Sequence, residues 1–287
     1  MSTGAAMRSS TPMRVGSEQW RAHAKAWYAG PMPPPRAMKD EPVLVTGAAS
    51  GIGRATVERL ADEGAWVALL DRDAGLLDEV ARRVRDRGGA RAVAIAADVS
   101  LEIEMQAAVA RAARELGGLR GLVTSAGIFD AGERRPLAEV ESAVFAHVLA
   151  TNLTGTFLVL KYALPHLLRD GGAIVTIAST AGLRGHGFGS GYTASKGGVI
   201  ALTRLVAYQY GERGVRANCV CPGFTDTPMT GGVARDPQYL ARLAPGIPLR
   251  RVAQPEEIAG LVCYLLGDGA SYVNGQVIAA DGGATVM

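Results

Sequence analysis

An α/β fold, with a parallel sheet covered by helices on both faces, is the fold class that the sequence predicts. Two observations predict it. Short apolar runs alternate with longer segments of helical pattern along most of the chain. A glycine-rich turn stands between the first apolar run and the first helical segment, as in sheets that bind nucleotides. The chain has 287 residues, of which 48% are hydrophobic, so it can bury the core of one such domain.

The elements follow one another in the order that this fold requires. Seven apolar runs are expected to form strands, near Val43, Val67, Val93, Leu122, Ile174, Val215 and Val277. Helices are expected between them over residues 55–63, 76–87, 105–116, 138–168 and 199–212. Parallel neighbours need such crossovers, and ligands of doubly wound sheets bind at the carboxyl ends of the strands.

The glycine-rich turn covers residues 46–53, Thr-Gly-Ala-Ala-Ser-Gly-Ile-Gly, directly after the first apolar run. In such a turn, backbone N–H groups and a helix N-terminus approach a pyrophosphate. Gly47 would allow the tight turn, Gly51 the close approach of the ligand, and Gly53 the packing of helix on strand. An ordinary glycine-rich loop is the alternative; the strand before and the helix after favour a dinucleotide site.

Asp71 closes the second apolar run and lies 18 positions after Gly53 (71 − 53). A carboxylate there accepts hydrogen bonds from the adenosine ribose and repels a 2′-phosphate, which favours NAD. Ser50 also favours NAD, because it stands where a basic residue would help an NADP site. Arg72 favours NADP instead, since its guanidinium could bind the 2′-phosphate. The sequence therefore predicts NAD, with NADP as the less favoured cofactor.

Tyr192 and Lys196 are four residues apart, which on a helix places both side chains on one face. A phenol has a pKa of about 10, and an ammonium beside it is expected to lower that value. A proton donor working near pH 7 needs a pKa lower by roughly three, equivalent to about 4 kcal/mol. The pair alone is weak evidence, because any surface helix can carry it.

Together these motifs resemble the short-chain dehydrogenase/reductase family, in its shorter single-domain form, over about residues 42–283. Further motifs of the family occur in order, with gaps of 27 residues from Asn152 to Ser179 (179 − 152) and 13 from Ser179 to Tyr192 (192 − 179). The resemblance implies a Rossmann-type, doubly wound, seven-stranded sheet. Thr124 and Ser125 stand where the family usually has an Asn-Asn pair. The property that this replacement is expected to affect is the affinity for the cofactor.

The resemblance also implies the site residues and their roles. Tyr192 would be the general acid or base, and Lys196 would lower its pKa and hold the nicotinamide ribose. Ser179 would donate a hydrogen bond to the substrate oxygen, and Asn152 would position a water that links Lys196 to solvent. The residues expected to bind the cofactor are Gly47, Ser50, Gly51, Ile52, Gly53, Asp71, Asp98, Val99, Ser125, Ala126, Gly127, Tyr192, Lys196, Pro222, Gly223, Thr225 and Thr227.

The expected substrate pocket is apolar, and residues 224–248 are expected to form a mobile lid. Its candidate residues are Phe129, Leu183, His186, Phe188, Phe224 and Met229. Few basic residues flank it, Arg184 being the exception, which disfavours a phosphorylated or carrier-bound substrate. The predicted function is NAD-dependent interconversion of a small apolar or cyclic secondary alcohol and its ketone. The alternatives are an NADPH-dependent 3-oxoacyl-thioester reductase and a nucleotide-binding protein without turnover.

Composition favours a cytoplasmic enzyme. The net charge is only +3, which gives no case for nucleic acid or an anionic membrane as partner. No uninterrupted apolar run reaches the roughly 18 residues of a membrane-spanning helix. The three cysteines lack the spacing of metal ligands, so reduced thiols in the core and no metal are expected. Members of the family usually associate, which implies a homotetramer with the helices around Asn152 and Tyr192 at one interface.

Residues 1–40 differ from the rest and are assigned to an N-terminal extension, leaving 41–287 as the catalytic domain. The extension has six basic residues against two acidic ones and holds two of the three tryptophans, Trp20 and Trp27. Prolines at positions 31 and 33–35 predict a stiff linker. Three interpretations stay open: a translation start at Met38, an arm that docks on the domain or a neighbouring subunit, and a disordered tail or targeting peptide.

Overall fold

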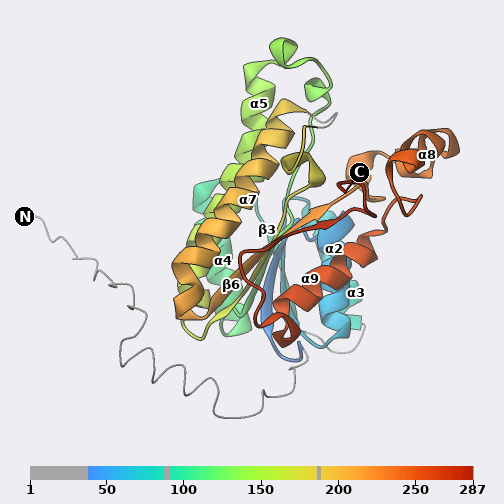
Figure 1. Ribbon diagram of the computed structural model, residues 1–287. Helices are drawn as coiled ribbons and strands as arrows, with labels where there is room; N and C mark the ends of the chain where they lie inside the picture. The colour runs from blue at the N-terminus through green and yellow to red at the C-terminus, as the bar shows by residue number, and fades with distance from the viewer. Residues whose placement is uncertain (1–37, 87–90, 186–188, 287) are drawn as a thin grey trace, which may run out of the picture. The chain divides into compact units, whose positions relative to one another are not determined.

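The computed structural model describes residues 38–86, 91–185 and 189–286. Its seven strands form one parallel sheet in the order β3-β2-β1-β4-β5-β6-β7, which confirms the predicted fold class (Figure 1). The strands are β1 (Pro42–Thr46), β2 (Trp66–Asp71), β3 (Ala92–Ala96), β4 (Gly121–Thr124), β5 (Gly172–Ile177), β6 (Val215–Pro222) and β7 (Val277–Ala280). The order reverses between β1 and β4, so the carboxyl ends of these two strands border a crevice.

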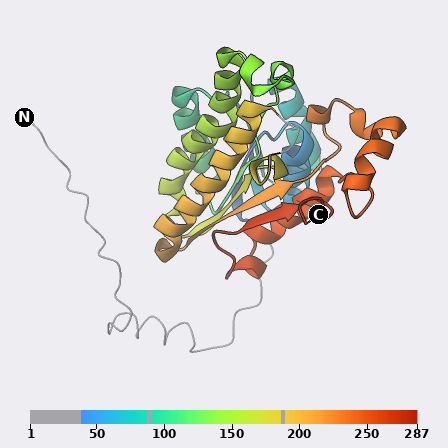
Figure 2. The same cartoon turned by 45° about the horizontal axis from the view of Figure 1, so that its top comes forward.

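Helices cover both faces of the sheet. The α-helices of the described residues are α2 (Gly51–Asp62), α3 (Ala74–Asp86), α4 (Glu102–Leu116), α5 (Ser142–Leu149), α6 (Gly155–Leu167), α7 (Ser190–Tyr210), α8 (Pro237–Leu243) and α9 (Pro255–Leu266). In Figure 1, α2, α3 and α9 lie on one side of the strands, and α4 and α7 on the other. The segment that carries α8 stands out from these layers, as Figure 2 shows.

The strands are apolar throughout because both of their faces are buried. In β1, Val43 and Val45 belong to the cluster that contains Leu60 of α2 and Ile258 of α9. Leu44, between them, belongs to the opposite cluster, with residues of α4 and α6. Successive side chains of a strand point to opposite faces, so the run of apolar residues supplies both cores.

The predicted ranges of α2, α3 and α4 agree with the structure to within four residues at each end, and two other helices differ more. The long helix predicted for 138–168 begins at Ser142 and is interrupted by η3 (Ala150–Thr154), a π-helical turn. Such turns occur frequently at functional sites. The helix predicted for 199–212 begins at Ser190, nine residues earlier, and so includes Tyr192. In addition, α8 lies inside the predicted lid, and α9 was absent from the predicted helical ranges.

The segment Ser142–Leu167 is, by length and composition alone, apolar enough to cross a membrane, with a hydropathy of 1.6. We interpret it as a helix of the domain core, because α6 packs against α4 and η3 contributes a fully buried asparagine to the site. Only 39% of its most apolar window is buried in the single chain.

Of the predicted N-terminal extension, residues 1–37 lie outside the described residues. Residues 38–40 lead directly into β1, and Met38 is buried against the core. The boundary at residue 40 and the role of the extension stay predictions.

Candidate active site

A cavity of about 870 Å³ opens at the carboxyl ends of the strands. Of the residues predicted to bind the cofactor, only Gly53 is absent from its lining. Gly53 packs against the turn itself: a Cβ atom at this position would lie 2.0 Å from the carbonyl oxygen of Gly47. The cavity therefore brings together segments that lie up to 192 residues apart (239 − 47).

The glycine-rich turn leaves room for a ligand at the N-terminus of α2. Gly47 has a φ of +66°, and a Cβ atom there would lie 2.7 Å from the backbone nitrogen of Ala126. No side chain caps α2, since Ser50 makes no capping hydrogen bond. The first N–H groups of the helix are therefore available to an anion, and they carry the positive end of the helix dipole.

Two carboxylates of the cavity lining lie at or just after the carboxyl ends of β2 and β3. Asp71 accepts hydrogen bonds from the backbone N–H groups of Ala49 (3.1 Å) and Asp73 (3.2 Å), which hold it at the end of β2. Asp98 accepts from both the N–H and the hydroxyl of Ser100. Burial acts to raise the pKa of Asp98, but these hydrogen bonds outweigh it and lower the pKa. Both groups lie where a ribose and an adenine are expected.

Tyr192, Ser179 and Lys196 meet in the middle of the cavity. Ser179 follows β5, and its Oγ accepts a hydrogen bond from the N–H of Ala181 at 3.1 Å. Its hydroxyl also interacts with Tyr192, which lies in the first turn of α7. Lys196, one turn further, donates from Nζ to the carbonyl oxygen of Ile177 at 2.9 Å. Its Nζ lies 5.5 Å from the centroid of the Tyr192 ring.

The expected lowering of the Tyr192 pKa by Lys196 is wrong for the protein alone. Burial raises the pKa of Tyr192, and the hydrogen bond with Ser179 offsets this only in part. Burial also lowers the pKa of Lys196 to about 8. The side chains are 9% and 4% exposed, respectively. Desolvation dominates both shifts, because burial disfavours the charged form of each group.

Asn152 anchors the loop that follows β4. Its Oδ1 accepts from the N–H of Ile128 (2.8 Å), and its Nδ2 donates to the carbonyl oxygen of Ile128 (3.0 Å) and to Ser195 Oγ (3.2 Å). The amide is fully buried and does not line the cavity. A bracing role follows directly from these contacts, whereas the water-positioning role stays a prediction.

Glu133 is a residue of the site that the sequence did not reveal. Its carboxylate is 2% exposed and accepts hydrogen bonds from the backbone N–H groups of Gly191 and Tyr192. A Cβ atom at Gly189 or Gly191 would lie within 2.6 Å of Glu133, so both glycines are needed for this approach. The carboxylate thus caps α7 from a distant loop and fixes the helix start beside Tyr192.

The substrate end combines expected and unexpected residues. Phe129, Phe224 and Met229 line the cavity as predicted, and the Phe129 ring contacts Tyr192 edge-on at 5.9 Å. Leu183 was wrongly assigned to the pocket: it is 42% exposed and absent from the lining, because η4 (Thr180–Gly182) turns the chain outward. His186 and Phe188 lie outside the described residues. Lining residues that the sequence analysis missed include Glu133, Arg134, Arg135, Thr151, Val233 and Tyr239.

Beneath the cavity, the cysteines are free and buried, as expected for core residues. Thr124, at the end of β4, is 2% exposed, and its hydroxyl has no hydrogen-bond partner among the described residues. The departure from the Asn-Asn pair thus leaves a buried polar group unsatisfied. Thr46 Oγ1 accepts from the N–H of Ala126 at 3.3 Å and supports the neighbouring loop.

Comparison with known proteins gives consistent results. A family model described as enoyl-(acyl carrier protein) reductase matches residues 47–285. The chain is 42% identical to cis-4-hydroxycyclohexanecarboxylate dehydrogenase of Sinomonas cyclohexanicum, over 88% of this chain and 99% of that protein. It is also 42% identical to a protein of Xanthobacter autotrophicus named inactive 2-(S)-hydroxypropyl-CoM dehydrogenase 2, over 78% and 96%. The crystal structure of levodione reductase superposes with a TM-score of 0.82 at 36% identity, covering 86% and 98%.

Proposed function

This chain belongs to the short-chain dehydrogenase/reductase family, and we propose that it is an NAD-dependent enzyme that interconverts a small secondary alcohol and its ketone, with Tyr192 as general acid and base. Oxidoreduction at CH–OH groups is the chemistry of its named relatives. The observation that carries the proposal is the contact of Tyr192 with Ser179 inside the cavity that the glycine-rich turn borders.

The residues present fit a dinucleotide. The uncapped N-terminus of α2 suits its pyrophosphate, and Asp71 suits its adenosine ribose. Lys196 and the turn around Pro222 and Gly223 line the part of the cavity proposed for the nicotinamide end. When bound, NAD supplies the hydride acceptor for alcohol oxidation.

The chain's own part in the reaction is proton transfer and orientation. Tyr192 as phenolate takes the hydroxyl proton of the alcohol, and as phenol it returns a proton during ketone reduction. The N–H of Ala181 donates to Ser179 Oγ and holds the hydroxyl beside Tyr192, from where it would donate its proton to the substrate oxygen when substrate is bound. In its protonated form, Lys196 supplies a positive charge that favours the phenolate form of Tyr192. Phe129 excludes water from one side of the phenol.

Asp71 favours NAD over NADP, since its carboxylate would repel a 2′-phosphate. The alternative, a 3-oxoacyl-thioester reductase that uses NADPH, has the description of the matching family model in its favour. Initial rates with NAD, NADP and their reduced forms, measured on one panel of alcohols and ketones, separate the two. Rates with NADPH above those with NADH, on acyl thioesters only, would replace our proposal with the alternative.

A nucleotide-binding protein without turnover is the second alternative, and one relative is named inactive. The side chains of Ser179, Tyr192 and Lys196 are all present and adjacent, which favours catalysis. We expect Tyr192→Phe to lose at least about 10²-fold in kcat while retaining NADH binding, the typical contribution of a general acid or base. Turnover that survives this substitution would exclude the mechanism.

We further propose a cytoplasmic homotetramer. Among the apolar side chains that one chain leaves exposed, Phe157, Leu205 and Tyr208 lie on α6 and α7, and Tyr264 lies on α9. The apolar segment Ser142–Leu167, only 39% buried in its most apolar window, acquires an apolar environment if α6 and α7 pack against a second copy. Multi-angle light scattering measures the mass directly, and a monomer of 29.8 kDa would refute the tetramer.

A further inference from the structure

Two arginines stand at the substrate end of the cavity, where the sequence predicted few basic residues. Arg134 and Arg135 follow η1 (Ala131–Glu133) and contribute to the cavity lining. The guanidinium of Arg134 lies 5.5 Å from the centroid of the Phe129 ring. That ring contacts Tyr192 at a centroid distance of 5.9 Å. A single aromatic ring therefore separates a positive charge from the phenol.

Neighbouring acids do not neutralise these two charges. The described residues contain no ion-pair partner within 4.0 Å of either guanidinium. The carboxylate of Glu133 accepts hydrogen bonds from the backbone of α7 instead. Asp130, also close in sequence, pairs with His147 at 3.4 Å. The remaining acids of the lining, Asp71 and Asp98, belong to the adenosine end of the cavity.

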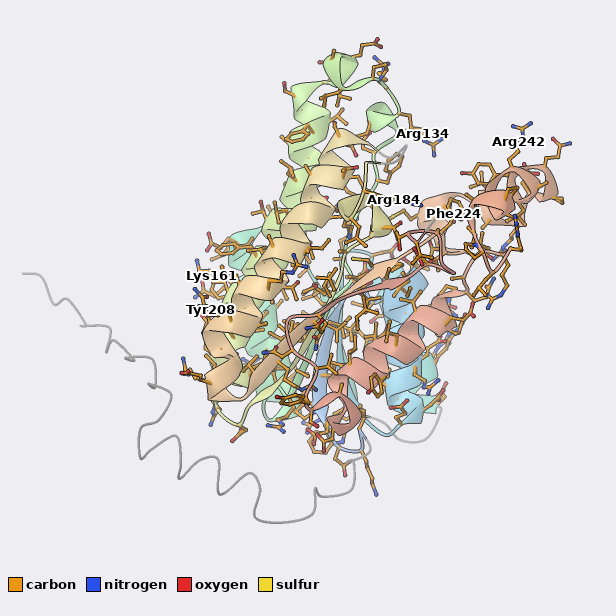
Figure 3. The ribbon with its side chains drawn as sticks, viewed as in Figure 1. Arg134, Lys161, Arg184, Tyr208, Phe224 and Arg242 are labelled. Atoms are coloured by element: carbon orange, nitrogen blue, oxygen red, sulfur yellow. The ribbon has the colours of Figure 1, made fainter. Side chains whose placement is uncertain are left out.

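A third guanidinium belongs to the loop that follows the catalytic serine. Arg184 and Arg134 both lie beyond the carboxyl end of the sheet, as Figure 3 shows. The Nε atom of Arg184 is buried and has no hydrogen-bond partner among residues 38–86, 91–185 and 189–286. Buried donors are normally paired, and the described residues provide no acceptor for this atom.

We propose that the substrate alcohol carries a carboxylate, which Arg134 and Arg135 bind at the mouth of the cavity while the carbinol carbon faces Tyr192. This inference rests on the proposed function and adds the substrate class to it. Guanidinium groups match carboxylates with two parallel N–H bonds, and such charge-assisted bonds are stronger than neutral ones. Between the two ends, Phe129, Phe224 and Met229 provide apolar walls for a small ring or short chain.

A binding experiment tests the carboxylate site without turnover. Calorimetry of the NADH-loaded enzyme with cyclohexanecarboxylate and with its neutral methyl ester compares one skeleton with and without the charge. We expect the acid to bind about 10- to 100-fold more tightly than the ester. Arg134→Gln and Arg135→Gln should each remove most of this preference. Arg114→Gln, which removes an exposed guanidinium on α4, is the matched control and should leave the preference unchanged.

A turnover experiment then separates the two proposals. With NAD, cis-4-hydroxycyclohexanecarboxylate should exceed its methyl ester in kcat/KM by a similar factor. Arg134→Gln should reduce this ratio mainly by raising KM for the acid. If the ester binds and reacts as well as the acid, the carboxylate site is refuted while the dehydrogenase stands. If the acid binds tightly through Arg134 but no alcohol is oxidised, the carboxylate site stands and the proposed function fails.

Discussion

Replacing Lys196 with methionine is expected to abolish catalysis and, at the same time, to stabilise the folded protein. The lysine is 4% exposed, and burial lowers its pKa from the ordinary 10.5 to about 8. The folded state therefore holds the ammonium less favourably than water does. Methionine has nearly the same length and volume and carries no charge, so it removes this penalty without leaving a cavity.

The size of the effect follows from the pKa. A value about 2.5 below 10.5 corresponds to roughly 3 kcal/mol, at about 1.4 kcal/mol for each pKa unit. Against this, the carbonyl oxygen of Ile177 loses its hydrogen bond from Nζ, which costs about 1 kcal/mol. A net gain of about 2 kcal/mol remains, and it should raise the midpoint of thermal unfolding by about 4–8 °C.

The stability gained by Lys196→Met should decrease as the pH rises. Because the folded-state pKa is the lower one, the unfolded chain binds more protons between pH 8 and pH 10.5. The penalty on the wild type is therefore complete below about pH 8, falls as the pH rises, and is absent above about 10.5. The advantage of Lys196→Met over the wild type should shrink over the same interval.

Calorimetric unfolding of both proteins at pH 7, 8, 9 and 10, at equal protein concentration, measures this difference. Lys161→Met is the matched control: that lysine, labelled in Figure 3, is 47% exposed and pairs with Glu102, so no such pH-dependent gain is expected. A variant that is no more stable than the wild type at pH 7 would refute the reasoning. A stability difference that stays constant from pH 7 to pH 10 would do the same.

Three further predictions concern single residues of the site. Glu133→Ala should lower the free energy of unfolding by about 2–5 kcal/mol in urea titrations, because it leaves two buried N–H groups of α7 without an acceptor; Glu139→Ala, an exposed neighbour, is the control. Asp71→Asn keeps the hydrogen-bond acceptor but removes the charge, so the ratio of kcat/KM for NADP to that for NAD should rise at least tenfold in steady-state assays. Thr124→Val should raise the free energy of unfolding by about 1 kcal/mol, since it replaces an unsatisfied buried hydroxyl with a methyl group of similar shape.

The sheet was predictable from the sequence because its signals are local. Each strand is a short apolar run, and both faces of a parallel strand are buried, so no partner is needed to recognise it. The glycine-rich turn was equally predictable, because Gly47 has a φ of +66°, and glycine is the residue that adopts such a positive φ readily. The order and spacing of Asn152, Ser179, Tyr192 and Lys196 identified the family, because a motif consists of residue types at fixed sequence separations.

Contacts between distant segments decided the rest. No local pattern indicates that Glu133 caps a helix 58 residues further on, and this contact sets the start of α7. Nor does sequence reveal that Leu183 turns outward while Arg134 lies over Phe129. The ionisation of Tyr192 and Lys196 depends on how completely the surrounding chain excludes water, and here desolvation raises the pKa of Tyr192 and lowers that of Lys196. Residue types and spacing thus determined which groups are present, whereas burial, a property of the whole packed domain, determined their charge and the space around them.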